Sequence, residues 1–294
     1  METAGTVAEM RRLSHAWHDE GRSIGLVPTM GSLHEGHASL VERAVAENGR
    51  VVVSVFVNPT QFGPGEDLER YPRDIERDSA LCASLGADAV FCPAPADMYR
   101  GHQTYVEQGL LTTTMEGASR PGHFRGVCTV VAKLFNIVAP TRAYFGQKDA
   151  QQLAVIRKMV ADLNFDVAIV ACPTVREADG LAASSRNAYL SAEEREAARV
   201  LSQAIACGQS AIAPGMSAAT LVEQMRAVIA AEPRAHIDYI EVVDTASMQP
   251  VEAVAGDVTV ALAATLGSTR LIDNFAYDAT RASQAADAPA GGAA

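Results

Sequence analysis

Two histidines, His34 and His37, stand three residues apart in a segment that also contains Gly31 and Gly36. An apolar run that predicts a strand precedes this segment, and a run that predicts a helix follows it. Free backbone N–H groups and the helix dipole favour anions at such a junction. Both imidazoles can donate hydrogen bonds to phosphate oxygens from the first helical turn, and both glycines permit a close backbone approach. The segment therefore predicts a site for the phosphates of a nucleotide.

A zinc site or a simple helix cap is the other chemistry that two histidines can indicate. Zinc on a regular helix favours ligands four residues apart together with a third ligand, and the chain has neither an H-E-x-x-H motif nor clustered cysteines. H-x-G-H after a strand resembles the signature of nucleotidyltransferases that attack the α-phosphate of ATP, including class I aminoacyl-tRNA synthetases. We therefore favour nucleotide chemistry over a metal site.

Polar amides follow the second predicted strand. Asn58 and Gln61 carry both donors and acceptors, so they can orient a substrate with hydroxyls and a carboxylate without adding charge. An Asn-Pro turn after a strand is, on its own, more typical of simple chain punctuation. Because parallel strands end at one edge of a sheet, we expect these amides to form a second wall beside His34.

A third polar group lies at another junction between a strand and a helix. Lys148 offers a mobile cation to phosphate, and Asp149 is placed to accept from ribose hydroxyls and to cap the helix. Gln152 is expected to face the same pocket one turn later. A solvated Lys-Asp pair is the alternative if this segment is taken alone.

A loop with two hydroxyls and a guanidinium follows near the expected domain boundary. Ser184, Ser185 and Arg186 can close over a triphosphate, with Arg186 offering two parallel hydrogen bonds. Gly180 and its small neighbours leave few apolar anchors, so we expect the loop to be mobile without ATP. A serine-rich linker is the alternative that composition alone supports.

Charge and composition exclude several classes of protein. The net charge of −11 opposes a general attraction to nucleic acid or to anionic membrane, so neither is an expected partner. Residues 120–160 nevertheless contain seven basic residues and one acid, which indicates either an anionic ligand or a basic solvated face. Five scattered cysteines fit reduced thiols, and no apolar run approaches the roughly 18 residues of a membrane span. We expect a cytoplasmic protein.

Apolar runs that read as buried strands alternate with helical patterns through the first half of the chain. The predicted strands cover residues 23–28, 50–57, 89–92, 142–146 and 167–172, and the predicted helices cover residues 37–47, 74–85, 129–139 and 150–163. This alternation predicts an α/β fold with a Rossmann-like doubly wound parallel sheet, over residues 1–174. Ligands are expected at the carboxyl ends of its strands.

The pattern changes in the second half. Two helices are predicted over residues 192–213 and 218–231, the first with a capping box of Ser191 and Glu194. Strands follow over residues 236–243, 258–263 and 270–276. We expect residues 175–280 to form a smaller C-terminal α+β domain that closes over the first, and residues 281–294 to be a disordered tail.

Taken together, five segments resemble the pantothenate synthetase family in their order and approximate spacing, and the resemblance extends from about Ser23 to Asp278. These segments are PTMGSLHEGH, VFVNPTQFG, RPGHFRGV, YFGQKDAQQL and DGLAASSRN. The resemblance implies condensation of pantoate with β-alanine through a pantoyl-adenylate, with ATP converted to AMP and pyrophosphate. It also implies Mg²⁺ held by the ATP phosphates and a homodimer. One position departs from the family, because Ala183 stands where a methionine is usual.

The resemblance also assigns roles to matching positions. Catalytic roles are implied for His34, His37 and Lys148. ATP contacts are implied for Met30, His34, His37, Gly146, Lys148, Asp149, Val175, Ser184, Ser185 and Arg186. Pantoate contacts, with Met30 nearby, are implied for Asn58, Gln61 and Gln152.

Two alternatives from other classes remain at this point. Another H-x-G-H nucleotidyltransferase or a class I synthetase-like adenylating enzyme shares the first motif, but a synthetase needs a basic tRNA-binding region that this acidic chain lacks. A catalytically silent nucleotide-binding protein is the alternative that is not an enzyme.

Overall fold

The computed structural model describes residues 1–280, and the predicted disordered tail over residues 281–294 lies outside them. The chain forms two compact units. The N-terminal unit comprises Met1–Ala178 and Ala182–Ala188, and the C-terminal unit comprises Asp179–Leu181 and the chain from Tyr189 onward. The boundary predicted after residue 174 stays a prediction, as does the closing role of the second domain.

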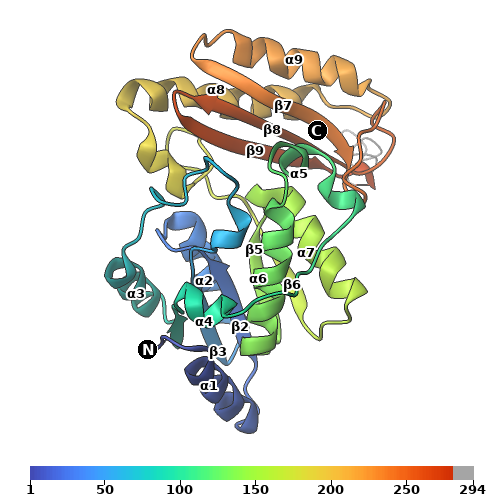
Figure 1. Ribbon diagram of the computed structural model, residues 1–294. Helices are drawn as coiled ribbons and strands as arrows, with labels where there is room; N and C mark the ends of the chain where they lie inside the picture. The colour runs from blue at the N-terminus through green and yellow to red at the C-terminus, as the bar shows by residue number, and fades with distance from the viewer. Residues whose placement is uncertain (281–294) are drawn as a thin grey trace, which may run out of the picture. The chain divides into compact units, whose positions relative to one another are not determined.

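A six-stranded parallel sheet organises the N-terminal unit, with the strand order β1-β4-β3-β2-β5-β6 (Figure 1). Its strands are β1 (Glu2–Ala4), β2 (Ile24–Thr29), β3 (Arg50–Val55), β4 (Ala89–Phe91), β5 (Arg142–Gly146) and β6 (Ala168–Cys172). The predicted α/β class and doubly wound sheet are confirmed. Five strands lie within two residues of their predicted bounds. β1 was missed because three residues are too few to show a periodicity.

Helices cover both faces of this sheet. The longer ones are α1 (Val7–Asp19), α2 (Glu35–Glu47), α3 (Ile75–Ser84), α6 (His123–Val138) and α7 (Ala150–Asp162), with the short α4 (Pro95–Tyr99) and α5 (Met115–Ser119) between them. α1 and α7 both pack against α6 on one face, and α2 packs against α3 on the other. From β2, the chain adds β3 and β4 on one side of the sheet and then β5 and β6 on the other, so the order of strand addition reverses between β2 and β5. Such a switch point is where ligands bind in open α/β sheets.

Two helical segments differ from expectation. α1 was not predicted, although Thr6 and Glu9 form a capping box at its start and Trp17 is buried on its inner face. α6 begins at His123, six residues before the predicted start, because its first turns carry polar residues and a glycine that are buried against the pocket loops. His123 is only 8% exposed there. Polar residues are typical of solvated loops, but the polar side chain of His123 is buried and hydrogen-bonded here.

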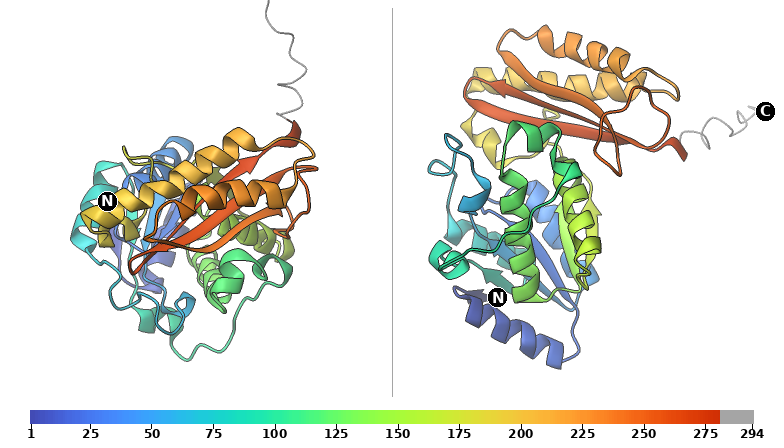
Figure 2. Two further views of the ribbon diagram at one scale, coloured as in Figure 1. Left: turned by 90° about the horizontal axis from the view of Figure 1, so that it is seen from above. Right: turned by 45° about the vertical axis from the view of Figure 1, so that its right-hand side comes forward.

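The C-terminal unit is a three-stranded antiparallel sheet with the order β7-β8-β9 and two helices on one face (Figure 2). Its elements are α8 (Ala192–Ala211), α9 (Ala218–Ala230), β7 (Ala235–Asp244), β8 (Val258–Leu266) and β9 (Thr269–Tyr277). The predicted capping box of Ser191 and Glu194 is confirmed.

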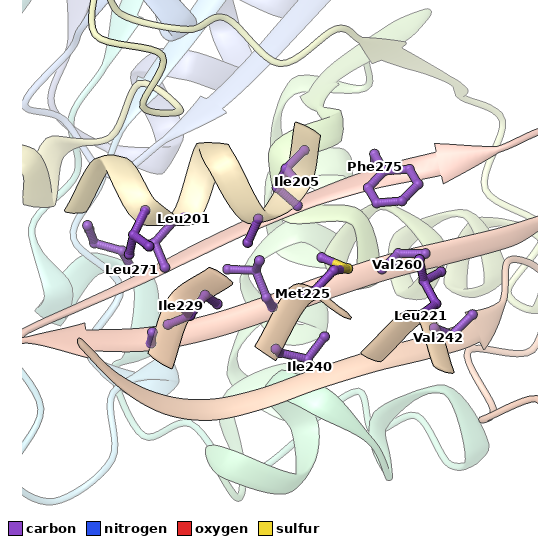
Figure 3. Packing of buried hydrophobic residues seen from close by; sticks show 14 of the residues in the cluster. Leu201, Ile205, Leu221, Met225, Ile229, Ile240, Val242, Val260, Leu271 and Phe275 are labelled. Atoms are coloured by element: carbon purple, nitrogen blue, oxygen red, sulfur yellow. The ribbon is translucent and has the colours of Figure 1, made fainter. Parts of the chain in front are cut away.

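Apolar side chains from both helices and all three strands gather between these layers (Figure 3). Met225, Leu221 and Ile229 of α9 are fully buried, and full burial of one such side chain contributes roughly 1.5–3 kcal/mol. A Cβ atom on Gly208 of α8 would lie 2.8 Å from the Met225 sulfur, so the close packing of the helices requires glycine there. Among residues 1–280, no helix is long and apolar enough to cross a membrane.

Candidate active site

All thirteen residues for which a ligand role was predicted line one pocket of the N-terminal unit. The pocket lies at the carboxyl ends of β2, β3 and β5, at the switch point of the sheet. It contains Met30, His34, His37, Asn58, Gln61, Gly146, Lys148, Asp149, Gln152, Val175, Ser184, Ser185 and Arg186. Segments separated by more than 150 residues in the chain thus meet around one space.

His34 and His37 shape the start of α2 through their ring nitrogens. His34 is the N-cap residue rather than part of the first turn, and its Nδ1 accepts from the backbone N–H of Gly36 at 3.1 Å. Nδ1 of His37 accepts from the backbone N–H of His34 at 3.4 Å. A backbone N–H can only donate, so both Nδ1 atoms are unprotonated. In each neutral ring the proton is therefore on Nε2, which is left to serve a ligand.

The charge state of both rings follows from their surroundings. Burial and then the nearby Lys148 lower the pKa of His34 to about 4. Burial, the neighbouring His34 ring and Lys148 hold the pKa of His37 well below its ordinary value. The ring centroids lie 4.0 Å apart, a distance at which two imidazolium charges would repel each other strongly. At neutral pH this pair offers two N–H dipoles, and Lys148 carries the positive charge.

A buried carboxylate shapes the loop before His34, and the sequence analysis missed it. Asp78 of α3 is 1% exposed and accepts from the backbone N–H groups of Ser32 and Leu33, at 2.8 Å each. Gly31 adopts φ +83°, and a Cβ atom there would lie 2.9 Å from the carboxylate. The available signal was an acid on the apolar stripe of a helix, four residues before the buried Cys82.

Lys148 and Asp149 occupy a short turn between β5 and α7. Their charged atoms lie 3.9 Å apart, and the side chain of Asp149 is 46% exposed. Asp149 stands at the N-cap of α7 but makes no capping hydrogen bond, so the predicted capping role is wrong. A 3-10 turn over Gln147–Asp149 leads directly into the helix, and the carboxylate lies near Lys148 instead. Gln152 lines the pocket one turn later, as predicted.

Asn58 is 1% exposed, and the protein itself fixes the orientation of its amide. Its Oδ1 accepts from the backbone N–H of Thr60 at 3.4 Å and from the Tyr99 hydroxyl at 2.6 Å. Its Nδ2 donates to the carbonyl of Gly126 at 3.1 Å. The Thr60 N–H can only donate and the Gly126 carbonyl can only accept, so a flipped amide would lose both bonds.

The fixed amide of Asn58 in turn orients Gln61. Nδ2 of Asn58 donates to Oε1 of Gln61 at 2.9 Å, which leaves Nε2 of Gln61 near the Met30 sulfur at 3.2 Å. Gln61 therefore presents donor hydrogens on the pocket wall. Both amides line the pocket, as predicted, but most of the hydrogen-bonding capacity of Asn58 is used inside the protein.

The loop with Ser184, Ser185 and Arg186 has more anchors than expected. Ser185 donates to the carbonyl of Ser32 at 3.0 Å, and Ala183 is buried, with its N–H donating to the carbonyl of Val175 at 2.9 Å. The expectation of few apolar anchors thus overlooked these hydrogen bonds and the burial of Ala183, and the mobility of the loop without ATP stays a prediction. Small side chains can be buried without the apolar bulk that a sequence pattern reveals.

Arg186 is held by a carboxylate from another loop. Its Nε and one terminal nitrogen donate to the two oxygens of Asp67, both at 3.0 Å. Burial opposes ionisation of Asp67, but the hydrogen bonds and charge of Arg186 win and lower the pKa of that carboxyl. Arg186 is thereby oriented at the pocket wall.

The basic residues of the segment 120–160 do not form one site. Of the seven, only Arg120 and Lys148 line the pocket. Arg125 and Lys133 lie over the rings of Tyr105 and Tyr99. The basic segment therefore splits between the pocket and other surfaces.

Comparisons with known proteins give one consistent result. The family model described as pantoate-beta-alanine ligase matches residues 2–276. A pantothenate synthetase of Ruminiclostridium cellulolyticum is 53% identical over 279 residues, which cover 94% of this chain and 99% of the relative. One from Moorella thermoacetica is 55% identical over 280 residues, covering 95% of this chain and 99% of the relative.

Solved structures agree with these relatives. A crystal structure of pantothenate synthetase from Thermus thermophilus has a TM-score of 0.88 and 48% identity, covering 94% of this chain and 99% of that chain. A pantoate-beta-alanine ligase from Francisella tularensis, complexed with beta-gamma ATP and beta-alanine, has a TM-score of 0.78 and 35% identity. It covers 94% of this chain and 97% of that chain.

Proposed function

Because this chain belongs to the pantoate–β-alanine ligase family and condenses pantoate with β-alanine in an ATP-dependent reaction, we propose that its N-terminal pocket does so through a pantoyl-adenylate. A carboxylate oxygen of pantoate attacks the α-phosphorus of ATP, the bond to the bridging oxygen breaks, and pyrophosphate leaves. The amine of β-alanine then attacks the acyl carbonyl, releases AMP and loses its proton. The other H-x-G-H enzymes are not favoured, because the family match covers nearly the whole chain.

The nucleotide occupies the side of the pocket formed by the histidine pair and the two flanking cations. Nε2–H of His34 and of His37 donate to phosphate oxygens, while Lys148 and Arg186 carry the positive charge that balances the leaving pyrophosphate. Ser184 and Ser185 add hydroxyl donors. Gly146 and Asp149 hold the adenosine, with Met30 and Val175 along its path. Catalysis here is alignment and charge stabilisation, and no side chain needs to form a covalent bond.

Pantoate lies on the opposite wall. Gln61 donates to an oxygen of pantoate, Gln152 adds a second amide, and Asn58 holds Gln61 in the required orientation. A neutral wall suits this task, since a cation there would hold the carboxylate away from the α-phosphorus.

Mg²⁺ is expected on the phosphates of ATP rather than on a protein site. Among residues 1–280, no group of three or more His, Cys, Asp or Glu residues could hold a metal ion. Of the described residues that line the pocket, Asp149 is the one with a carboxylate. The ion would supply further charge stabilisation to the phosphates. We also propose a cytoplasmic homodimer. The first point is supported by five free cysteines, and the second rests on the family resemblance alone.

The observation that carries the proposal is the convergence of the histidine pair, Lys148 and the Asn58–Gln61 amides at one switch point. Exchange of labelled pyrophosphate into ATP tests it. We expect exchange that depends on pantoate and does not need β-alanine, with amino acids as controls. Exchange that ignores pantoate, or product formation without any exchange, would contradict an adenylate intermediate formed by pantoate.

A further inference from the structure

The N-terminal turn of α6 presses against the short 3-10 turn Pro59–Gln61, and the reason for this contact is not explained by the roles proposed above. Gly126 makes the approach possible, since a Cβ atom there would lie 2.4 Å from the Thr60 carbonyl oxygen and 2.6 Å from Cα of Gln61. Backbone atoms cannot yield to such a contact as a flexible side chain can. The sequence RPGHFRG thus contains a glycine that lets a helix touch the turn carrying Gln61.

A histidine in the same turn of α6 holds that turn directly. Nδ1 of His123 lies 2.9 Å from the carbonyl oxygen of Gln61, and the residue is 8% exposed. A carbonyl oxygen only accepts, so Nδ1 carries the proton and the neutral ring has an unprotonated Nε2. That atom lies 3.3 Å from a terminal nitrogen of Arg120, which can only donate. Burial, and then the charge of Arg120, lower the pKa of His123 to about 4, in keeping with a neutral ring.

Both amides of the pantoate wall are consequently tied to α6. The backbone of Gln61 is held by His123, and the side chain of Gln61 is held by Asn58. Asn58 itself donates to the carbonyl of Gly126, three residues after His123. Gln61 is therefore fixed at its backbone by His123 and at its side chain by Asn58, which is itself bonded to the same turn of α6 through Gly126.

We propose that His123 is a positioning residue for the acid substrate, because its Nδ1–H bond to the Gln61 carbonyl sets the place from which Gln61 donates. This inference rests on the proposed role of Gln61. His123 acts through Gln61, and its effect falls on pantoate more than on ATP.

Two conservative variants separate this role from simple filling of space. The amide nitrogen of asparagine can take the place of Nδ1, whereas that of glutamine takes the place of Nε2. Glutamine is closer to histidine in volume than asparagine is. If only volume matters, His123→Gln is the milder change, but if the bond to Gln61 matters, His123→Asn is milder.

The experiment measures KM for pantoate, KM for ATP and the melting temperature in both variants. We expect His123→Gln to raise the pantoate KM about tenfold, the usual effect of one lost buried hydrogen bond, and His123→Asn to stay within about threefold of the unchanged protein. The ATP KM should change little in either variant. His18→Ala is the matched control, because His18 also bonds a backbone carbonyl, that of Ala139 at 3.0 Å, but does not line the pocket.

Other outcomes separate the possible failures. If Gln61→Ala leaves the pantoate KM unchanged, the acid site itself is misplaced and the inference falls with it. If Gln61→Ala raises that KM while both His123 variants resemble the unchanged protein, only the inference is overturned. An equal loss in both His123 variants, or a loss shared equally by pantoate and ATP, also overturns it.

Discussion

At the scale of single residues, the pocket divides its tasks between neutral donors and fixed cations. The histidine pair is kept neutral by burial and by Lys148, so in the proposed mechanism its Nε2–H groups orient phosphate while Lys148 supplies charge. This division has a structural cause. Each Nδ1 is occupied by a backbone N–H at the start of α2, and the tautomer of both rings is fixed before any ligand arrives.

His34→Ala and Lys148→Ala should each reduce pantoate-dependent pyrophosphate exchange by roughly 10²–10³-fold, because each removes a donor to charge that develops in the transition state. The measurement is the exchange rate, with folding checked by circular dichroism. Near-normal exchange in a folded variant would remove that residue from the proposed mechanism. Lys158→Ala is a suitable control, since Lys158 pairs with Asp162 on α7 and does not line the pocket.

Gln61→Glu should impair pantoate use more than Gln61→Ala does. A carboxylate can still accept from Asn58, but it cannot donate, and it repels the carboxylate of pantoate. We expect the rise in the pantoate KM to correspond to a larger free energy than the roughly 1–3 kcal/mol of one lost polar contact. The ATP KM should change little. Steady-state kinetics of both variants decide this. A glutamate variant with the milder defect would mean that the wall accepts rather than donates.

Three histidines with lowered pKa values, the half-buried His34 and His37 and the buried His123, should make the stability depend on pH. The folded-state pKa values of His34, His37 and His123 lie below the ordinary value of 6.5, so the unfolded chain binds more protons as the pH falls below 6.5. Their contribution to stability is complete above that pH and decreases toward pH 4, by at most roughly 1.4 kcal/mol per pH unit for each histidine. Urea unfolding between pH 7 and 5.5 measures the slope. The slope should become shallower in His34→Gln, and an unchanged slope would contradict a lowered pKa.

At the scale of elements, the pocket depends on backbone segments that approach each other closely. Asp78 of α3 gathers two N–H groups of the loop before α2, and Gly126 lets α6 meet the turn that carries Gln61. These supports come from helices whose apolar stripes include a polar or small residue. Such residues fix where the site side chains stand, although they do not touch the ligands that we propose.

The loop that carries Ala183 offers an element-scale test of the nucleotide wall. Ala183 is buried, lines the pocket and lies where the family usually has methionine. Ala183→Met should tighten ATP binding modestly, because burial of a methionine contributes roughly 1.5–3 kcal/mol and ordering it removes up to about 1.5–2 kcal/mol of that. Calorimetric titration with a non-hydrolysable ATP analogue compares the two proteins. Unchanged or weaker binding would mean that the adenine is packed by other residues.

Sequence patterns predicted the strands and the residues that line the pocket better than they predicted the residues that support them. Strand ends and glycines marked the positions of His34, Asn58 and Lys148, since these junctions have local signatures. Asp78 and His123 could not be found that way. Their roles exist only once the chain is folded, because each bonds a backbone group more than 40 residues away.

At the scale of the whole molecule, the two units differ in how they are built. The N-terminal unit surrounds its parallel sheet with helices on both faces, and the C-terminal unit has both helices on one face of its antiparallel sheet. The predicted order of strands and helices anticipated this contrast. The path of the chain between the units could not be predicted, because short segments with small residues carry no periodicity.

Along this path the chain passes from one unit to the other more than once, so the two units are not consecutive in the sequence. Asp179–Leu181 belongs to the C-terminal unit, although the next seven residues return to the N-terminal one. Leu181 is part of the C-terminal core, and Asp179 pairs with Arg195 at 2.7 Å. No single cut of the chain can therefore release either unit intact. A fragment of residues 179–280 should melt at a higher temperature than one of residues 189–280. Equal melting temperatures would show that Asp179–Leu181 does not stabilise the isolated C-terminal unit.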